Sequence, residues 1–463
     1  MRVFKLIQLK FKPFGILFII FLCPCIAQAQ QPITDTIQKL LIKSKVAGAA
    51  ITVIKNEEVV YSGNYGYADI ANNIPVSDNT EFGIMSLSKN FVACAVLQLS
   101  NNNKINLDAS VLDYIYELPK LYAPVKIYQL LNHTSGVPDY VHVKGYMQHA
   151  NKSQTPLAVL NPIFNDPLEF VPGTKNDYSN SNYMLLGILI ERVSGKKLKD
   201  YLNEMIFQPL GMKHTYLEEN IMGNRDKAKG YTLKNDHLAY QEPLDPSQYW
   251  AAGGIVSTKN DMLLYHKALI SGRLLSMSIV KTMMTPVKLG DGTNSEYGLG
   301  FELMQTPELE MAGNTGVGLG YNAAYLDFFK DDITIIILTN TTNGNSALIA
   351  KQIHDAISSN HVSLDKPNQD NLDEMVKSVF KNALQGNAEQ ANFQDAEILE
   401  KFKQTAIPYI QQHGELLTVE QKGEKKNPER VIRRYQITFK NSASMWVIIF
   451  SKEGKIIMFN HME

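Results

Sequence analysis

Alternating apolar and polar positions near the start of the chain predict a β-hairpin. The first alternating run spans residues 48–54, a polar turn follows at Asn56-Glu57-Glu58, and a second run ends near Tyr67 and Ala68. A period of two is typical of strands that bury one face, and a short polar segment between two such runs is typical of a turn. We therefore expect the first domain to open with two antiparallel strands.

From Phe82 to about Met284 the apolar positions change to a helical spacing, interrupted by loops that contain proline and glycine. Strand patterns then return in four segments, at Tyr297 to Met304, Glu310 to Met311, Tyr321 to Phe329 and Ile333 to Asn340. Lys330-Asp331-Asp332 fits a hairpin turn between the last two. The pattern predicts an α/β fold of the α+β type. One antiparallel sheet is built from the N- and C-terminal segments of the domain, and a helical region is inserted between them.

The remainder of the chain predicts a second, smaller domain. A helical pattern at Ser346 to Ser358 closes the first domain, and the polar segment after it, with Pro367, is typical of a linker. Two helical and three strand patterns follow, at Leu372 to Leu384, Ala396 to Phe402, Val431 to Phe439, Met445 to Phe450 and Lys455 to Phe459. We expect the first domain at residues 30–360, the linker at 361–370 and a small α+β domain at 371–463.

Residues 1–29 show the three parts of a secretory signal peptide. Basic residues come first, the apolar run Phe14 to Leu22 follows, and Ala27-Gln28-Ala29 supplies small residues for cleavage. One alternative is an uncleaved membrane anchor, but the apolar run is short for a bilayer span. The other is a lipid-modified cysteine, but Cys23 and Cys25 follow Leu22 and Pro24 rather than a small residue. We therefore expect a periplasmic or secreted protein that is cleaved near Ala29.

Composition narrows the classes of function. The 463 residues include 45 basic and 46 acidic ones, which gives a formal net charge of −1. This balance, with no basic stripe among aromatic residues, argues against nucleic acid as a partner. Beyond the signal segment the only cysteine is Cys94, so the mature chain cannot form an internal disulfide.

Metal and cofactor sites are not expected. His133, His142 and His149 lack the His-Glu-x-x-His spacing of a zinc-binding helix, and no cluster of cysteines and histidines is present. We expect His133 to be structural. Tyr140 and His142 follow a proline and are expected on a solvated loop, with the rim of the cleft as the alternative.

Ser86-Leu87-Ser88-Lys89 is the segment with the clearest chemistry. It leads into residues 91–97, which are apolar on every side and typical of a fully buried helix. On a helix Ser86 and Lys89 share a face, so the lysine nitrogen can reach the hydroxyl. A lysine kept neutral by apolar surroundings can take the proton of a serine and make it a nucleophile. The same spacing recurs in ordinary amphipathic or helix-end contexts, for example at Ser194, Ser278 and Ser378.

Two further segments carry candidate chemistry. Tyr178-Ser179-Asn180 follows Pro172-Gly173 and precedes a helical run, which places Tyr178 on a loop at a helix start, where it can serve as a base or as part of the core surface. Residues 313–320 are rich in glycine, which suits a flexible turn or a close approach of the backbone to a ligand.

These pieces, in this order, resemble the serine β-lactamase and penicillin-binding-protein superfamily, whose nucleophile lies in Ser-x-x-Lys. The likeness is greatest to the class C branch, which is marked by Tyr-x-Asn. Leu130 to Gly136 and Ala252 to Thr258 also resemble recurring loops of that family. The resemblance covers roughly Val46 to Ser358 and does not include the tail.

The resemblance implies roles for particular residues. Ser86 would be the acylated nucleophile, with Lys89 and Tyr178 sharing general-base and general-acid work. The backbone N–H groups of Ser86 and Val317 would form the oxyanion hole. The residues expected to bind substrate are Asn180, Asn314, Thr315, Gly316 and Val317.

Asn314 departs from the family pattern, which usually has lysine or histidine before Thr-Gly. Asparagine keeps hydrogen bonding but loses the positive charge that favours a substrate carboxylate. The leading hypothesis is therefore an exported serine hydrolase that acts, through an acyl-enzyme on Ser86, on D-amino peptides of the peptidoglycan type or on small esters and amides. The alternatives are a true β-lactamase and a non-catalytic protein that binds or senses penicillin or wall fragments. The expected partners are a small-molecule or peptide substrate and the cell wall, and no partner is assigned to the C-terminal domain.

Overall fold

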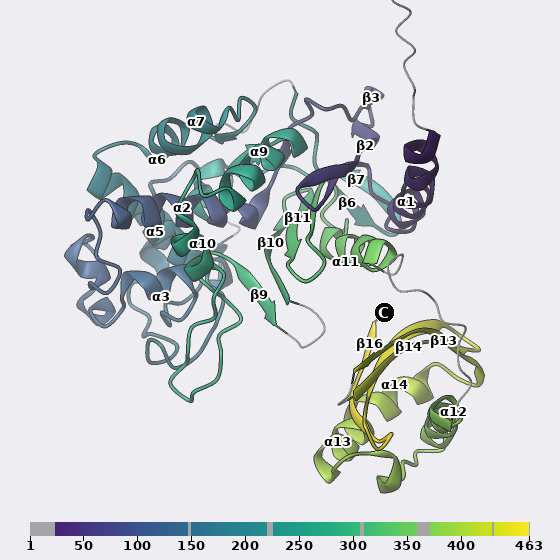
Figure 1. The fold of residues 1–463 in the computed structure, drawn as a ribbon. Helices are drawn as coiled ribbons and strands as arrows, with labels where there is room; N and C mark the ends of the chain where they lie inside the picture. The colour runs from purple at the N-terminus through teal and green to yellow at the C-terminus, as the bar shows by residue number, and fades with distance from the viewer. Residues whose placement is uncertain are drawn as a thin grey trace, which may run out of the picture. The chain divides into compact units, whose positions relative to one another are not determined.

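The computed structural model describes residues 24–146, 150–219, 226–305, 310–358, 371–427 and 430–462. The chain divides into two compact units, one ending at Ser358 and the other beginning at Ser359 (Figure 1). The apolar run Phe14 to Leu22 lies outside the described residues, and helix α1 (Pro24–Lys43) passes through Ala29. No helix in the described part of the chain is long and apolar enough to span a membrane.

The first unit is built on a seven-stranded antiparallel sheet with the order β3-β2-β1-β12-β11-β10-β9. Its strands are β1 (Gly48–Lys55), β2 (Glu58–Asp69), β3 (Ile74–Pro75), β9 (Glu302–Gln305), β10 (Glu310–Gly318), β11 (Tyr321–Phe328) and β12 (Ile333–Thr339). The first strand pairs with the last, as Ala49 opposite Thr339, which confirms the prediction that both ends of the domain build one sheet.

Both faces of the central strands are covered, which explains why every residue of β12 is buried. Helices α1 and α11 (Ser346–Ser358) pack together, and their apolar side chains share a core with one face of β1 and β12. Helix α9 (Lys259–Ile270) contacts both strands, and its apolar residues belong to the second core of the unit. A strand buried on both sides carries a nearly continuous run of β-branched residues, as the Ile-rich sequence of β12 does.

The inserted region is mainly helical. Its helices are α2 (Ser88–Asn101), α3 (Ile127–Leu131), α4 (Pro156–Leu160), α5 (Asn180–Ser194), α6 (Leu198–Leu202), α7 (Gln208–Leu210), α8 (Trp250–Gly253), α9 and α10 (Met277–Met283). Short strands accompany them: β4 (Phe82–Gly83), β8 (Ile255–Ser257) and β5 (Tyr216–Leu217) form one sheet, and β6 (Tyr231–Lys234) and β7 (His237–Tyr240) form a hairpin. Phe91 to Leu97 of α2 are at most 4% exposed, so the expected buried helix is confirmed.

The glycine-rich segment differs from its prediction as a turn. Most of it is strand β10, which pairs along its length with β11. The strand expected at Tyr297 to Met304 is shorter, because Gly298 and Gly300 form a loop in which Gly300 has φ +93° and Gly298 N donates to Phe301 O at 2.9 Å. Glycine in β10 thus serves close packing rather than a turn.

The second unit contains three helices and a four-stranded antiparallel sheet of order β13-β14-β15-β16, which share one hydrophobic core. The elements are α12 (Asn371–Leu384), α13 (Ala396–Lys401), α14 (Ile407–Gln412), β13 (Leu416–Asn427), β14 (Arg430–Phe439), β15 (Ala443–Ser451) and β16 (Ile456–Met462). Aromatic rings fill its core, with Phe380 and Trp446 at 4.8 Å between centroids. Strand β13 was not predicted, because its Lys- and Glu-rich second half lacks apolar alternation.

Candidate active site

Ser86 lies in a 3₁₀ turn, η1 (Met85–Leu87), immediately before α2. The turn is tightly formed: Met85 has φ +49°, and Ile84 N donates to Ile255 O at 3.0 Å. Positive φ at a non-glycine residue is uncommon and is tolerated where the surroundings enforce it. The turn leaves Ser86 partly exposed while its neighbours are buried.

Lys89 is 2% exposed and lies in the first turn of α2. Its Nζ contacts three acceptors, which are Ser86 Oγ at 3.0 Å, Asn180 Oδ1 at 2.9 Å and Ala252 O at 2.7 Å. Burial lowers the pKa of Lys89 to about 7, although the Asp139 carboxylate acts in the opposite direction. Near neutral pH a substantial fraction of this amine is therefore uncharged and able to accept a proton.

Tyr178 is the second side chain that contacts the serine hydroxyl. Its hydroxyl lies 2.8 Å from Ser86 Oγ, and its ring stacks on His133 at 4.5 Å between centroids. Burial raises the pKa of Tyr178 above its ordinary value, so the side chain remains a neutral phenol. The Ser86 hydroxyl is thus placed between a lysine amine and a phenol, which together can remove and deliver a proton.

His133 packs against the ring of Tyr178. Its Nδ1 accepts a hydrogen bond from Ser179 N at 3.1 Å, and burial holds its pKa well below the ordinary value. The neutral imidazole is a packing surface for Tyr178. Tyr297, which sequence reasoning did not single out, lies edge-on to the same imidazole at 4.8 Å.

Asn180 begins helix α5 and contacts two residues with its side-chain amide. Its Oδ1 accepts from Lys89 Nζ, and its Nδ2 donates to Asp139 Oδ2 at 2.9 Å. Asp139 was also missed in the sequence. An aspartate in a loop after proline is common, and only the fold brings it beside a helix start that lies forty-one positions further along the chain.

Strand β10 passes directly against the serine turn. A β-carbon at Gly316 would overlap Ile84 O and would lie 2.9 Å from Ser86 N, so only glycine fits there. Val317, the next residue, is 58% exposed, and Thr315 is partly buried. The Ser86 N–H and the backbone around Val317 are therefore neighbours, while substrate contacts of Thr315, Gly316 and Val317 stay predictions.

Asn314 uses its side chain within the protein. The residue is 5% exposed, its Oδ1 accepts from Glu302 N at 2.9 Å, and its Nδ2 donates to Gly300 O at 2.9 Å. The amide thus joins β10 to the start of β9. Its role in substrate binding stays a prediction, and it would have to exchange these hydrogen bonds to contact a ligand.

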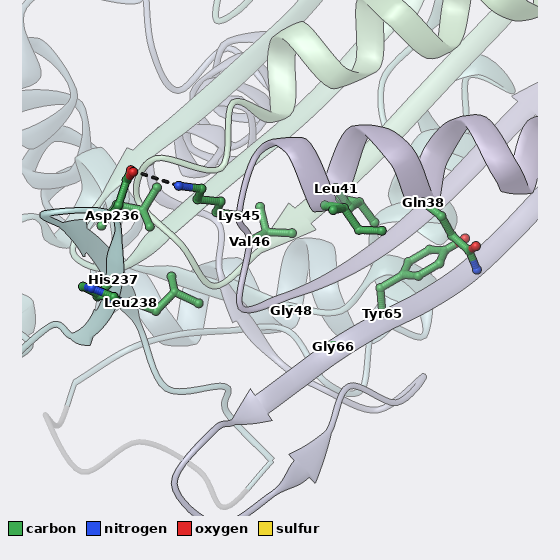
Figure 2. A pocket seen from close by; sticks show the side chains of 12 residues that line it. Gln38, Leu41, Lys45, Val46, Gly48, Tyr65, Gly66, Asp236, His237 and Leu238 are labelled. Carbon is green, nitrogen blue, oxygen red and sulfur yellow. Dashed lines mark ion pairs between the residues drawn. The ribbon is translucent and has the colours of Figure 1, made fainter.

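A pocket of about 530 Å³ lies elsewhere in the first unit. Figure 2 shows it beside α1, where Leu41, Val46 and Leu238 line it and Lys45 forms a 3.0 Å ion pair with Asp236. None of its lining residues belongs to the cluster around Ser86. Among the described residues, no group of three His, Cys, Asp or Glu side chains has the arrangement of metal ligands.

Comparison with known proteins places the chain in a family. The sequence model named Beta-lactamase matches residues 33–357. The putative penicillin-binding protein PbpX of Bacillus subtilis (strain 168) is 30% identical over 324 residues, which cover 70% of this chain and 78% of that protein.

Solved structures agree. The D-amino acid amidase from Ochrobactrum anthropi SV3 complexed with L-phenylalanine amide has a TM-score of 0.60 at 25% identity and covers 71% of this chain and 99% of its own. The octameric penicillin-binding protein homologue from Pyrococcus abyssi has a TM-score of 0.62 at 22% identity and covers 93% of this chain and 95% of its own, a likeness of fold alone. The chain belongs to the beta-lactamase family of hydrolases, whose fold penicillin-binding proteins and D-amino acid amidases share.

Proposed function

We propose that this protein is an exported serine hydrolase that forms an acyl-enzyme on Ser86. One observation carries the proposal: Ser86 Oγ lies 3.0 Å from Lys89 Nζ and 2.8 Å from the Tyr178 hydroxyl. Burial also lowers the pKa of Lys89 to about 7, where its neutral form can act as a base.

The first half of the reaction transfers the acyl group to the enzyme. Neutral Lys89 accepts the Ser86 proton as Oγ attacks the carbonyl carbon, and the carbonyl oxygen becomes an oxyanion that the N–H groups of Ser86 and Val317 stabilise. When the tetrahedral intermediate collapses, the bond to the leaving group breaks. The leaving nitrogen or oxygen takes the Tyr178 proton, and the Tyr178 oxygen regains a proton from the Lys89 ammonium group.

The second half releases the product. A water molecule attacks the ester carbonyl of the acyl-enzyme and gives one proton to Lys89 and Tyr178, which again act together as the base. The Ser86–acyl bond then breaks, Ser86 Oγ recovers a proton, and the carboxylic acid leaves. The two halves use the same residues in reversed roles, so no further catalytic group is required.

The proposed substrates are D-amino peptides of the peptidoglycan type or small esters and amides. Asn314 carries no charge, which favours acyl donors without a carboxylate at that position. Similarity to a D-amino acid amidase and to a putative penicillin-binding protein supports D-configured amides and peptides. The same asparagine disfavours an efficient β-lactamase, which remains the second candidate.

Intact-protein mass spectrometry tests the acyl-enzyme. The full chain is incubated with a fluorophosphonate and, separately, with penicillin, and we expect a mass gain that is absent in Ser86→Ala. Ser194→Ala, which alters another Ser-x-x-Lys segment, is the matched control and should label normally. Equal labelling of Ser86→Ala and the parent would refute Ser86 as the nucleophile. The protein could also be labelled at Ser86 and yet hydrolyse neither D-phenylalanine amide nor any ester tested. That result would favour the binding or sensor function.

Export is tested separately. We expect the N-terminus of protein recovered from outside the cytoplasm of an expressing bacterium to lie near residue 30, after the small residues that end at Ala29. An intact Met1 on membrane-bound protein would favour the anchor.

A further inference from the structure

The Asn180 amide stands between a lysine and a carboxylate. Its Oδ1 accepts from Lys89 Nζ at 2.9 Å, and its Nδ2 donates to Asp139 Oδ2 at 2.9 Å. An ionised carboxylate only accepts hydrogen bonds, so Asp139 can face the NH₂ end of the amide but not its oxygen. The carboxylate therefore decides which end of Asn180 is offered to Lys89.

Asp139 is held in place by the backbone. It lies at the start of the 3₁₀ turn η4 (Tyr140–His142), where its Oδ1 accepts from Val141 N at 3.3 Å. The residue is 6% exposed. Because one carboxylate oxygen is fixed by the turn, the other oxygen is left in a defined position toward Asn180.

We propose that Asp139 is a positioning residue for the acylation of Ser86, acting through the Asn180 amide to hold the Lys89 amine in line with the Ser86 hydroxyl. This inference rests on the proposed function, because it requires Lys89 to act as the base. Asp139 contacts neither the serine nor the position of the reacting carbonyl. Its contribution is the direction of the amide and a negative charge near the amine.

The other titratable groups that face Lys89 are neutral. The rings of Tyr178 and Tyr183 lie 4.9 Å and 5.6 Å from Nζ, and burial raises the pKa of both phenols. The pKa of His133 is held well below its ordinary value, in part by Lys89 itself. Asp139 is the group that raises the pKa of Lys89 against burial, so removing its charge should lower that pKa.

The variant Asp139→Asn tests the direction of the Asn180 amide and the negative charge near Lys89 while leaving the folding of the turn intact. Asparagine keeps the size and an oxygen for Val141 N, but it removes the charge and can turn an NH₂ group toward Asn180, which frees the Asn180 amide to rotate. We expect the maximal rate of Ser86 labelling by a fluorophosphonate to fall roughly 10- to 100-fold, because a displaced base costs about that much. We also expect the acid limb of the pH–rate profile to move to lower pH.

Asp245→Asn is the matched control. Asp245 begins the 3₁₀ turn η8 (Pro246–Gln248) in the same way, with its Oδ1 accepting from Ser247 N at 3.0 Å, and it contacts none of the residues around Ser86 named above. This variant should keep both the rate and the acid limb of the parent. In an Asn180→Ala background, Asp139→Asn should cost less than threefold in maximal rate, because the amide through which it acts is gone.

The outcomes separate the inference from the function on which it rests. If the parent protein is not labelled at Ser86, the proposed function fails. If the parent is labelled and Asp139→Asn lowers only the melting temperature, with an unmoved acid limb, Asp139 is merely structural. Carbon-13 NMR of lysine-labelled protein, with Lys89→Met for assignment, gives the Lys89 titration without turnover, and an unchanged titration in Asp139→Asn would overturn the inference. If Asp139→Asn does not fold, Asp139→Ser retains an oxygen for the turn and takes its place in both measurements.

Discussion

The carbonyl oxygen of Ala252 accepts a 2.7 Å hydrogen bond from Lys89 Nζ. It is a backbone acceptor, so no titration or rotamer change can remove it. Ile255 N, three residues later, donates to Ser88 Oγ at 3.0 Å, which ties the same segment to the start of α2. The segment from Ala252 to Ile255 therefore holds the lysine by a contact that is independent of Asn180.

Lys89 leads to a prediction about pH. Because its pKa is about 7 and only the neutral amine accepts a proton, the rate constant kcat/KM should rise with pH and level off above about pH 7. Lys89→Arg cannot lose its proton in the accessible range, so it should remove the rise together with most of the activity. Hydrolysis of an uncharged ester measured across pH checks this. A profile without an acid limb in the parent protein would exclude Lys89 as the base.

Gly316 leads to a prediction about packing. A β-carbon there would overlap Ile84 O, so Gly316→Ala should push β10 away from the serine turn. We expect labelling of Ser86 to fall about 100-fold and the free energy of unfolding to drop by about 1–3 kcal/mol. Denaturant titration and labelling kinetics measure the two effects.

Gly290→Ala is the matched control for Gly316→Ala, since its nearest neighbours would lie at ordinary contact distance, 3.4 Å from the new β-carbon, and its φ is not positive. It should alter neither quantity. Normal labelling of Gly316→Ala would show that the turn and the strand can separate without loss of chemistry.

Asn314→Lys tests the departure from the family pattern. The new charge should speed acylation by penicillin, whose carboxylate it can attract. The lost hydrogen bonds to Gly300 O and Glu302 N should lower the free energy of unfolding by about 1–3 kcal/mol. Asn314→Ala, which loses the same hydrogen bonds without adding charge, should show the lower stability alone. If both variants are acylated faster by penicillin, the added positive charge does not explain the faster acylation of Asn314→Lys.

Asp373 leads to a prediction about the second unit. Its Oδ1 accepts from Arg433 Nη1 at 2.8 Å and from the Tyr435 hydroxyl at 2.7 Å, and Arg433 is 1% exposed. Asp373→Ala leaves the buried arginine without this carboxylate, which should cost about 3–5 kcal/mol and unfold residues 371–463 before the first unit. Limited proteolysis should cut the tail while ester hydrolysis persists. A parallel loss of hydrolysis would show that the second unit is needed for activity. Lys377→Ala, which alters an exposed side chain of α12, is the control and should keep the stability of the parent.

The sequence predicted the parts of this molecule in which local pattern and burial agree. The strands at residues 48–55 and 333–339 alternate or run apolar because they lie in the middle of a sheet, and α2 is apolar all round because it is enclosed. Strand β10 was predicted only at its first two residues, Glu310 and Met311, because the glycines that follow serve contact with η1, a reason that appears only in three dimensions. Strand β13 was missed because its charged half does not alternate.

Some residues of the candidate site could be predicted from the sequence and others could not. Ser86, Lys89, Tyr178 and Asn180 lie in short motifs, and the structure brings them within hydrogen-bond distance. Asp139 and Tyr297 carry no motif, and the carbonyl oxygen of Ala252 is a group that every residue has. Their relevance depends on direction and distance, which spacing along the chain does not encode.

The pairing of β1 with β12 has a consequence for the order of folding. Ala49 cannot find Thr339 until almost the whole first unit has left the ribosome, and closing so long a loop makes the search slow. Strand β10, which contacts the Ser86 turn, is synthesised only shortly before β12, so until then the turn lacks this strand against it. The proposed nucleophile is therefore assembled late, and an incompletely synthesised chain carries Ser86 and Lys89 without the backbone of β10 beside them.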